Sequence, residues 1–316
     1  MRTSWLSLPI LLAVASSSCG QEAKPSAKGS DSAVPWQGPE KLKVEHLPNA
    51  YQIHRRVISG GLPNREDGFR ELAALGVKTI ISVDGAKPDV VLAQKYGLRY
   101  VHLPHGYDGI PDGRAAELAK AVRDLPGRIY IHCHHGKHRS PTAAAVACVA
   151  AGMLDPTGAE TVLRTAGTNE GYRGLYLSAR EARPLDGKLL DSLTPAFPAI
   201  AKVPPLAESM VAIEHVHDHL KEIAAAGWKS LPEHPDLEAA HEALLMREHF
   251  TELLRASQSQ PEKFQALLRD GEASVEELED ALRDFQPDKI TTAFERINKS
   301  CTDCHREFRD KPLREK

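Results

Sequence analysis

A proline-rich segment divides this 316-residue chain into two halves with different patterns of apolar residues. Between Arg183 and Pro205 the helical pattern lapses, and prolines occur at positions 184, 195, 198, 204 and 205. Before this segment, short apolar and amphipathic runs alternate; after it, the amphipathic runs are long. Because proline interrupts both helices and central strands, residues 184–204 are predicted to link two separately folded domains.

The first half alternates strand patterns with helix patterns. Its predicted strands are Tyr51–Ile58, Val77–Val83, Leu98–Leu103 and Arg128–Ile131, and its predicted helices are Asp67–Leu75, Val90–Tyr96, Ala115–Leu125 and Pro141–Ala151. This order predicts an α/β domain over residues 46–183, with a mostly parallel central sheet and helices on both faces. Ligands of such sheets bind at the carboxyl ends of the strands.

The second half, residues 205–316, contains four long amphipathic segments joined by short connections. The segments are Leu206–Ala225, Leu237–Ser257, Pro261–Phe285 with a break near Gly271, and Asp288–Arg309. Segments of this length and spacing predict an all-α, antiparallel four-helix bundle.

The N-terminus has the pattern of an export signal. Met1-Arg2 precedes the apolar run Trp5–Ala15, which is too short for a permanent membrane span, and small residues follow it. Residues 1–18 resemble a bacterial lipoprotein signal, which implies lipidation at Cys19 and a periplasmic location; the alternative is ordinary cleavage and a soluble product. Residues 19–45, rich in Ser, Gly, Lys and Pro, are predicted to be a flexible tether.

Charge and cysteine content argue against two classes of protein, nucleic-acid binders and disulfide-framework proteins. A formal net charge of −3 gives no excess of basic residues for binding nucleic acid. The five cysteines are too few, and too unevenly spaced, for a disulfide framework, so each needs its own explanation. Cys148 lies within the nearly all-apolar helix Pro141–Ala151 and is predicted to be a core residue.

The segment His132–Ser140 is predicted to bind phosphate. It follows a strand and precedes a helix, so the backbone N–H groups of residues 134–139 can form a concave nest for an anion. Gly136 permits the turn. Arg139 can hold two phosphate oxygens with its planar fork, and the same positive field favours the thiolate of Cys133. The predicted phosphate-binding residues are His134, His135, Gly136, Lys137, His138 and Arg139.

The run from Cys133 to Arg139, followed by Ser140-Pro141-Thr142, resembles the Cys-x5-Arg-Ser/Thr signature of the cysteine-dependent tyrosine and dual-specificity phosphatases. The resemblance implies that Cys133 is the nucleophile of a phosphocysteine intermediate. It also implies that Arg139 clamps the phosphate and that Ser140 eases the departure of the thiolate. From its position, Ser140 is also predicted to cap the following helix.

Hydrolysis by this route needs a general acid for the leaving oxygen and a base for the attacking water. The resemblance implies an aspartate on the loop after the strand that ends at Leu103, where Asp108 fits the spacing better than Asp112. In the alternative, both carboxylates only solvate or cap the next helix. The segment Gly167–Tyr172 resembles the one that buttresses the phosphate loop in dual-specificity enzymes.

The loop is more basic than the plainest members of this family. Its Gly-Lys-His-Arg run resembles that of plant and fungal atypical dual-specificity phosphatases that act on inositol pyrophosphates. His134, His135, Lys137 and His138 are expected to add positive potential, in part titratable near neutral pH. Multiply phosphorylated small molecules such as inositol phosphates are therefore candidate substrates, beside phosphotyrosine in phosphoproteins. A metal site is not expected, because adjacent side chains on a tight loop should diverge.

The last helix carries Cys301-Thr-Asp-Cys304-His305, the pattern of covalent haem c attachment. Two thiols at this spacing form thioethers with the haem vinyl groups, and the adjacent imidazole reaches the iron. One haem near the end of a four-helix bundle resembles the class II cytochromes c, the cytochrome c prime group. The resemblance implies His305 as the proximal ligand and a distal ligand, if any, from the first helix, where Met210 and His217 share the apolar stripe.

These features together predict an exported phosphatase coupled to a haem c domain that senses redox state or gas. An electron-transfer protein or nitric oxide is a candidate partner, and a membrane is expected only through a lipid anchor. Two alternatives stay open. Cys133 could carry a persulfide in a haem-linked sulfur-transfer or sulfur-oxidation enzyme, or the chain could be a non-catalytic, haem-bearing anion sensor.

Overall fold

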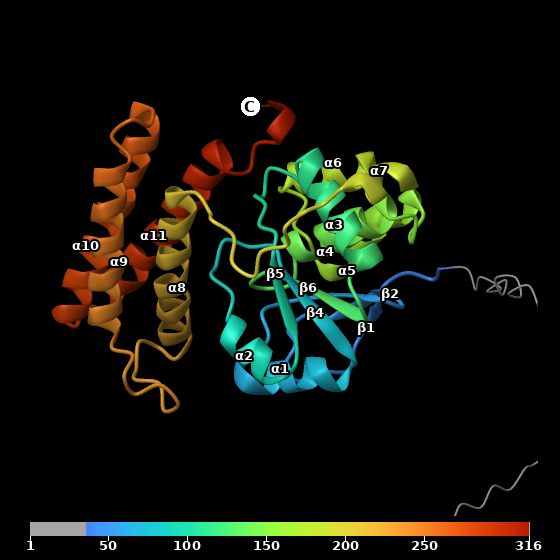
Figure 1. Cartoon of the computed structure of the whole chain (residues 1–316). Helices are drawn as coiled ribbons and strands as arrows, with labels where there is room; N and C mark the ends of the chain where they lie inside the picture. The colour runs from blue at the N-terminus through green and yellow to red at the C-terminus, as the bar shows by residue number, and fades with distance from the viewer. Residues whose placement is uncertain (1–35, 316) are drawn as a thin grey trace, which may run out of the picture. The chain divides into compact units, whose positions relative to one another are not determined.

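The computed structural model describes residues 36–315 of the chain (Figure 1). The predicted export signal, Cys19 and most of the predicted tether lie outside these described residues. From Gln37 onward the chain forms one compact unit. Within residues 36–315, no helix has the length and apolarity required to cross a membrane.

A six-stranded sheet with the order β1-β2-β3-β6-β4-β5 forms the centre of the first half. Its strands are Glu40–Lys41 (β1), Tyr51–His54 (β2), Val57–Gly60 (β3), Val77–Ser82 (β4), Arg99–His102 (β5) and Arg128–His132 (β6). The strands β3, β6, β4 and β5 are parallel, whereas β1 and β2 add an antiparallel edge. The predicted mostly parallel sheet is confirmed, but the predicted strand over residues 51–58 is the hairpin of β2 and β3.

Alternation along the strands produces a separate apolar core on each face of the sheet. On one face, Ile80 and Tyr130 pack with the helices Arg65–Ala74 (α1) and Val90–Lys95 (α2). On the other, Ile81 and Ile131 pack with Asp112–Asp124 (α3), Arg139–Ala150 (α4), Ala159–Ala166 (α5) and Arg173–Glu181 (α6). Figure 1 shows α1 and α2 on the side of the sheet opposite to α3–α6. The predicted helices on both faces are therefore confirmed.

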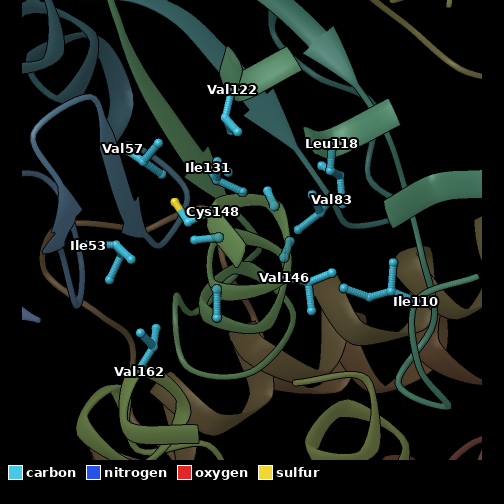
Figure 2. Packing of buried hydrophobic residues seen from close by; sticks show 14 of the residues in the cluster. Ile53, Val57, Val83, Ile110, Leu118, Val122, Ile131, Val146, Cys148 and Val162 are labelled. Atoms are coloured by element: carbon cyan, nitrogen blue, oxygen red, sulfur yellow. The ribbon is translucent and has the colours of Figure 1, made fainter. Parts of the chain in front are cut away.

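The helix α4 is buried along its whole length, as its apolar sequence predicts. Its Cys148 lies among aliphatic side chains that include Val57 and Ile131 (Figure 2), and burial raises the pKa of this thiol to about 12. The prediction of Cys148 as a core residue is confirmed. The helix ends at Ala150, and Gly152, which follows the C-cap residue Ala151, has a φ of +71° that suits a residue without a side chain.

Four helices form the bundle of the second half (Figure 1): Pro205–Ala225 (α8), Ala239–Ala256 (α9), Glu262–Arg283 (α10) and Pro287–Phe308 (α11). Their apolar faces meet in one core. The predicted break near Gly271 is wrong, because α10 is continuous there. A Cβ at position 271 would lie 2.8 Å from Cε1 of Phe250, so the glycine allows α9 and α10 to approach closely.

Two short elements lie outside the ranges predicted for the folded domains. The strand β1 pairs with β2 from within the predicted tether. The helix Gly187–Ser192 (α7) lies in the predicted linker, and its Leu190 is buried against Ala119 of α3 and Ala150 of α4. The linker is therefore partly packed onto the first domain.

Candidate phosphate site and haem site

The loop from Cys133 to His138 follows the end of β6, at the centre of the parallel part of the sheet. Its carbonyl groups point outward to neighbouring donors: His134 O accepts from the N–H of Leu62, Gly136 O from Asn49 Nδ2 and Lys137 O from Thr168 Oγ1. In a planar trans peptide the following N–H points the opposite way. The amides of residues 135, 137 and 138 are therefore directed to the inside of the loop, as the predicted anion nest requires.

Gly136 has a role beyond the turn. Its φ is +71°, and a Cβ there would lie 2.4 Å from the backbone nitrogen of Gly61. The glycine therefore lets the loop pack directly on the backbone after β3, and any larger residue would displace the loop.

Cys133 and Ser140 contact each other across the mouth of the loop. The Cys133 side chain is buried, and its Sγ lies 3.3 Å from Oγ of Ser140, which also donates to the carbonyl of Gly60 at 2.8 Å. A hydroxyl has one proton and can rotate it between two acceptors, so Ser140 can donate to a thiolate when one forms. The predicted capping role of Ser140 is wrong, because α4 begins at Arg139 and its N-cap residue is His138.

Arg139 is buried at the first position of α4, with 8% of its surface exposed. Its guanidinium lies 4.6 Å from the ring centroid of Tyr107. Burial alone would lower the pKa of Arg139, but the fields of Tyr107, Asp84 and Cys133 outweigh burial and raise it, so the side chain stays charged. Among residues 36–315 its Nε has no hydrogen-bond partner.

The loop histidines differ in charge. Asp218 of α8 lies 2.8 Å from Nε2 of His134 and raises the pKa of that imidazole. In contrast, burial lowers the pKa of His135, and it lowers that of His138 to about 4. The expectation that all three add positive charge near neutral pH is therefore wrong for His135 and His138. Positive charge on this loop comes instead from Lys137, His134 and Arg139.

The expectation that adjacent loop histidines diverge is also wrong. The ring centroids of His134 and His135 are 4.4 Å apart, and their nitrogen atoms and the Asp218 carboxylate lie within 4.8 Å of one another. The 2.8 Å contact and the raised pKa of His134 indicate an ion pair between His134 and Asp218.

The two candidate acids occupy different positions. Asp108 lies on the loop between β5 and α3, and a Cβ at Gly106 would be 2.2 Å from its Oδ1, so the carboxylate lies over Gly106. Asp112 is the first residue of α3, where a negative charge stabilises the helix dipole. This position suits the predicted helix-end role for Asp112, and the role of Asp108 as general acid remains a prediction.

Sequence reasoning did not single out Tyr107, the neighbour of Asp108. Its ring centroid lies 4.7 Å from that of Tyr172, which in turn lies 4.7 Å from that of His138. The segment Gly167–Tyr172 therefore supports the loop both through this ring and through the Thr168 hydrogen bond to Lys137. An aromatic residue directly before the candidate acid Asp108 was the available signal.

His105 is a second residue that the sequence did not reveal. It is 9% exposed, its Nε2 has no hydrogen-bond partner among the described residues, and burial lowers its pKa to about 4. A neutral, buried imidazole on the same loop as Asp108 adds a polar group without adding charge. Nothing in its local sequence distinguishes it from a solvent-exposed histidine.

A cavity of about 520 Å³ lies beside the loop. Arg139 and His134 line it, together with Glu208, Val211 and Glu214 of α8. Side chains of both halves of the chain therefore surround the space next to the phosphate loop.

The second site lies on α11. Cys304 is buried and Cys301 half-buried, both against the bundle core, and both are free thiols. Burial lowers the pKa of His305 to about 3, so its imidazole is neutral and can ligate iron. On α8, Nε2–H of His217 donates to Oδ1 of Asn298 of α11 at 2.8 Å, while Met210 packs against the bundle core. Thiols, neutral imidazole and apolar surroundings fit a covalently attached haem.

Comparison with known proteins identifies the bundle first. Residues 211–309 match the profile of the family described as Cytochrome C', and this range includes Cys301, Cys304 and His305. The predicted resemblance of the second half to this group is confirmed. A search of curated proteins gives no match.

Several solved structures are similar to part of the chain. TpbA from P. aeruginosa is 21% identical in sequence. The alignment covers 48% of this chain and 93% of TpbA, with a TM-score of 0.41. TpbA in complex with pTyr is 21% identical. That alignment covers 45% of this chain and 87% of TpbA, with a TM-score of 0.38. The catalytic domain of the PP-IP phosphatase SIW14 from S. cerevisiae is 16% identical. The alignment covers 47% of this chain and 92% of the SIW14 domain, with a TM-score of 0.39.

Proposed function

We propose that the chain is an exported phosphatase that hydrolyses phosphate monoesters through a phosphocysteine intermediate, joined to a bundle that carries one covalent haem c. The observation that carries the proposal is the pairing of Cys133 with a buried, charged Arg139 whose Nε has no partner among the described residues. A buried cation needs a counter-ion, and a phosphate bound in the loop would supply it.

The first chemical step forms a bond between Sγ of Cys133 and phosphorus and breaks the bond from phosphorus to the ester oxygen. Arg139 and the loop amides neutralise the charge on the non-bridging oxygens. Asp108, in its acid form, gives its proton to the leaving oxygen.

The second step hydrolyses the intermediate. Asp108, now a carboxylate, takes a proton from water while the water oxygen attacks phosphorus and the bond to Sγ breaks. Ser140, whose Oγ lies 3.3 Å from Sγ, donates a hydrogen bond to the departing thiolate and keeps its proton. Phosphate and the original thiolate are the products, so the cycle consumes only ester and water.

In the second domain, Cys301 and Cys304 would hold the haem through thioether bonds and His305 would ligate the iron. When bound, the haem supplies a redox centre that can also bind a gas such as nitric oxide. Met210 and His217 are the candidate distal ligands from α8. Haem c is attached outside the cytoplasm, which supports the proposed export and a periplasmic location, with lipidation at Cys19 as the proposed anchor.

The proposed substrates are multiply phosphorylated small molecules such as inositol phosphates, with phosphotyrosine as the competing class. Lys137 supplies a cationic side chain on the same loop as Arg139 for a further phosphate group. Release of phosphate from phytate and from a phosphotyrosine peptide, compared at equal concentration, distinguishes the two classes.

The decisive experiment substitutes the nucleophile in the holo protein. We expect Cys133→Ser to abolish phosphate release from an aryl phosphate without changing the haem absorption spectrum. Cys148→Ala is the matched control, because this thiol lies in the aliphatic core of the same domain. The variant should keep its activity provided that it folds. Phosphate release by Cys133→Ser at the wild-type rate would refute the proposal.

A further inference from the structure

Two guanidinium groups enclose the ring of Tyr107. Arg139 lies 4.6 Å from the ring centroid and Arg309, which directly follows α11, lies 4.2 Å from it. Arg309 also lies 5.6 Å from the ring centroid of Tyr172. A cation–π contact is stronger when the cation is desolvated than when it is exposed. The side chain next to Asp108 is therefore held jointly by the phosphate site and by the haem-carrying helix.

The same C-terminal segment contacts the main chain of Asp108. The N–H of Leu313 donates to the carbonyl of Asp108 at 2.9 Å. On the other side, Gly174 of α6 packs so closely that a Cβ there would lie 2.0 Å from the same carbonyl oxygen. The backbone of Asp108 thus lies between α6 and the segment after α11.

Two ion pairs fix the end of this segment on α6. Glu315 pairs with Arg173, and Arg314 pairs with Glu181 at 2.7 Å. All four side chains are well exposed, so solvent screens both pairs and each stabilises the contact only weakly. The stacked Arg309 and the Leu313 hydrogen bond are consequently the stronger attachments.

The attachment begins one helical turn after the haem motif. The N–H groups of Arg309 and Asp310 both donate to the carbonyl of His305, each at 2.9 Å. A displacement of His305 along or across the helix axis therefore changes the position of Arg309 directly. The phosphate loop, in contrast, is fixed by its own contacts with β3 and with Asn49 and Thr168.

We propose that Arg309 and Leu313 are positioning residues for the loop that carries Asp108, so that proton donation to the leaving group depends on the end of the haem-carrying helix. The inference rests on the proposed phosphatase function and adds the regulation of the same site. It implies an effect on the rate of the chemical step, with little effect on phosphate binding.

The test compares Arg309→Ala with Arg306→Ala in the full-length holo protein. Arg306 lies on the last turn of the same helix, is well exposed and pairs only locally with Asp303. Removing Arg309 should lower kcat for phenyl phosphate about 10-fold to 100-fold, a part of the roughly 10²–10⁴ that a general acid supplies. The loss should be smaller for p-nitrophenyl phosphate, whose leaving group needs less protonation. Arg306→Ala should match the wild type.

Three further readouts separate positioning from general damage. The inhibition constant of inorganic phosphate and the haem spectrum should not change in Arg309→Ala. Arg309→Lys should restore part of the lost rate, because an ammonium retains one cation–π contact. Hydrogen–deuterium exchange of residues 105–109 should be faster in Arg309→Ala than in Arg306→Ala, whether or not the protein turns over any ester.

The possible failures are distinguishable. If the wild type releases no phosphate from any ester, the proposed function fails, while the exchange experiment still decides whether Arg309 holds the loop. If the wild type is active but Arg309→Ala matches Arg306→Ala in both rate and exchange, the positioning role is wrong. Equal losses on both esters with weakened phosphate inhibition would also overturn it, since that result describes damage to the phosphate loop.

Discussion

The phosphate loop and the haem motif both place cysteine next to histidine, but they assemble their surroundings differently. The loop gathers a thiol, inward amides, a guanidinium and a hydroxyl within residues 133–140 at the end of one strand. The motif on α11 supplies two thiols and one imidazole on a single helix, and α8 lies against this helix, where His217 is hydrogen-bonded to Asn298. The loop is therefore complete within one strand–loop–helix unit, whereas the haem site depends on packing between helices.

The sharpest test of this difference removes both thiols of the haem motif. We expect Cys301→Ala with Cys304→Ala to lose covalent haem completely, because the other two cysteines of residues 36–315, Cys133 and Cys148, lie in the core of the first domain. Absorption of the denatured, acid-extracted protein measures the retained haem. Binding of inorganic phosphate should stay within about threefold of the wild type, since Leu62, Asn49 and Thr168 of the first domain hold the backbone of the loop. Loss of phosphate binding in parallel with the haem would show that the loop needs the bundle.

A second prediction breaks the loop and leaves the bundle unchanged. Arg139→Lys keeps the charge but loses the planar fork that meets two phosphate oxygens, so kcat/KM should fall roughly 10²–10³-fold. Steady-state hydrolysis of an aryl phosphate measures the effect, and the haem spectrum is the control. Activity within a few-fold of the wild type would mean that Arg139 acts as a point charge only.

The strand–loop–helix unit and the haem motif were predictable because their parts are adjacent in the sequence. Cys133, Gly136, Arg139 and Ser140 lie within eight residues, so local backbone geometry brings them together. The same holds for Cys301, Cys304 and His305, which one helix presents within two turns.

Contacts between distant parts of the chain were not predictable. His134 meets Asp218 across 84 residues, and Tyr107 meets Arg309 from the other end of the chain. No periodicity in either segment encodes such pairings, because they depend on how the helix ends pack. The charge states of His135 and His138 were missed for the same reason, since burial sets them and a single sequence does not show it.

The smallest expected effect concerns the ion pair between His134 and Asp218. The pKa of His134 is raised from 6.5, so its contribution to stability is complete below pH 6.5 and is lost as the pH rises through the raised value. Burial alone would raise the pKa of Asp218, but hydrogen bonds from His134 and Lys221 outweigh it. The net pKa lies well below 3.8, so the contribution of Asp218 is present above pH 3.8. The pair should therefore stabilise the protein most between about pH 4 and 6.5.

Asp218→Asn should lower the free energy of unfolding in this window by at most about 1 kcal/mol, because the His134 side chain is partly exposed to solvent. The difference from the wild type should shrink as the pH rises from 6.5 through the raised pKa of His134. Urea unfolding of the holo protein at several pH values measures it. Lys221→Gln removes the other partner of Asp218 and is the control, since it leaves the contact between His134 and Asp218 in place. The free energy of unfolding of Asp218→Asn could instead differ from that of the wild type by the same amount at every pH from 5 to 9. The contact between the phosphate loop and α8 would then not depend on the charge of His134.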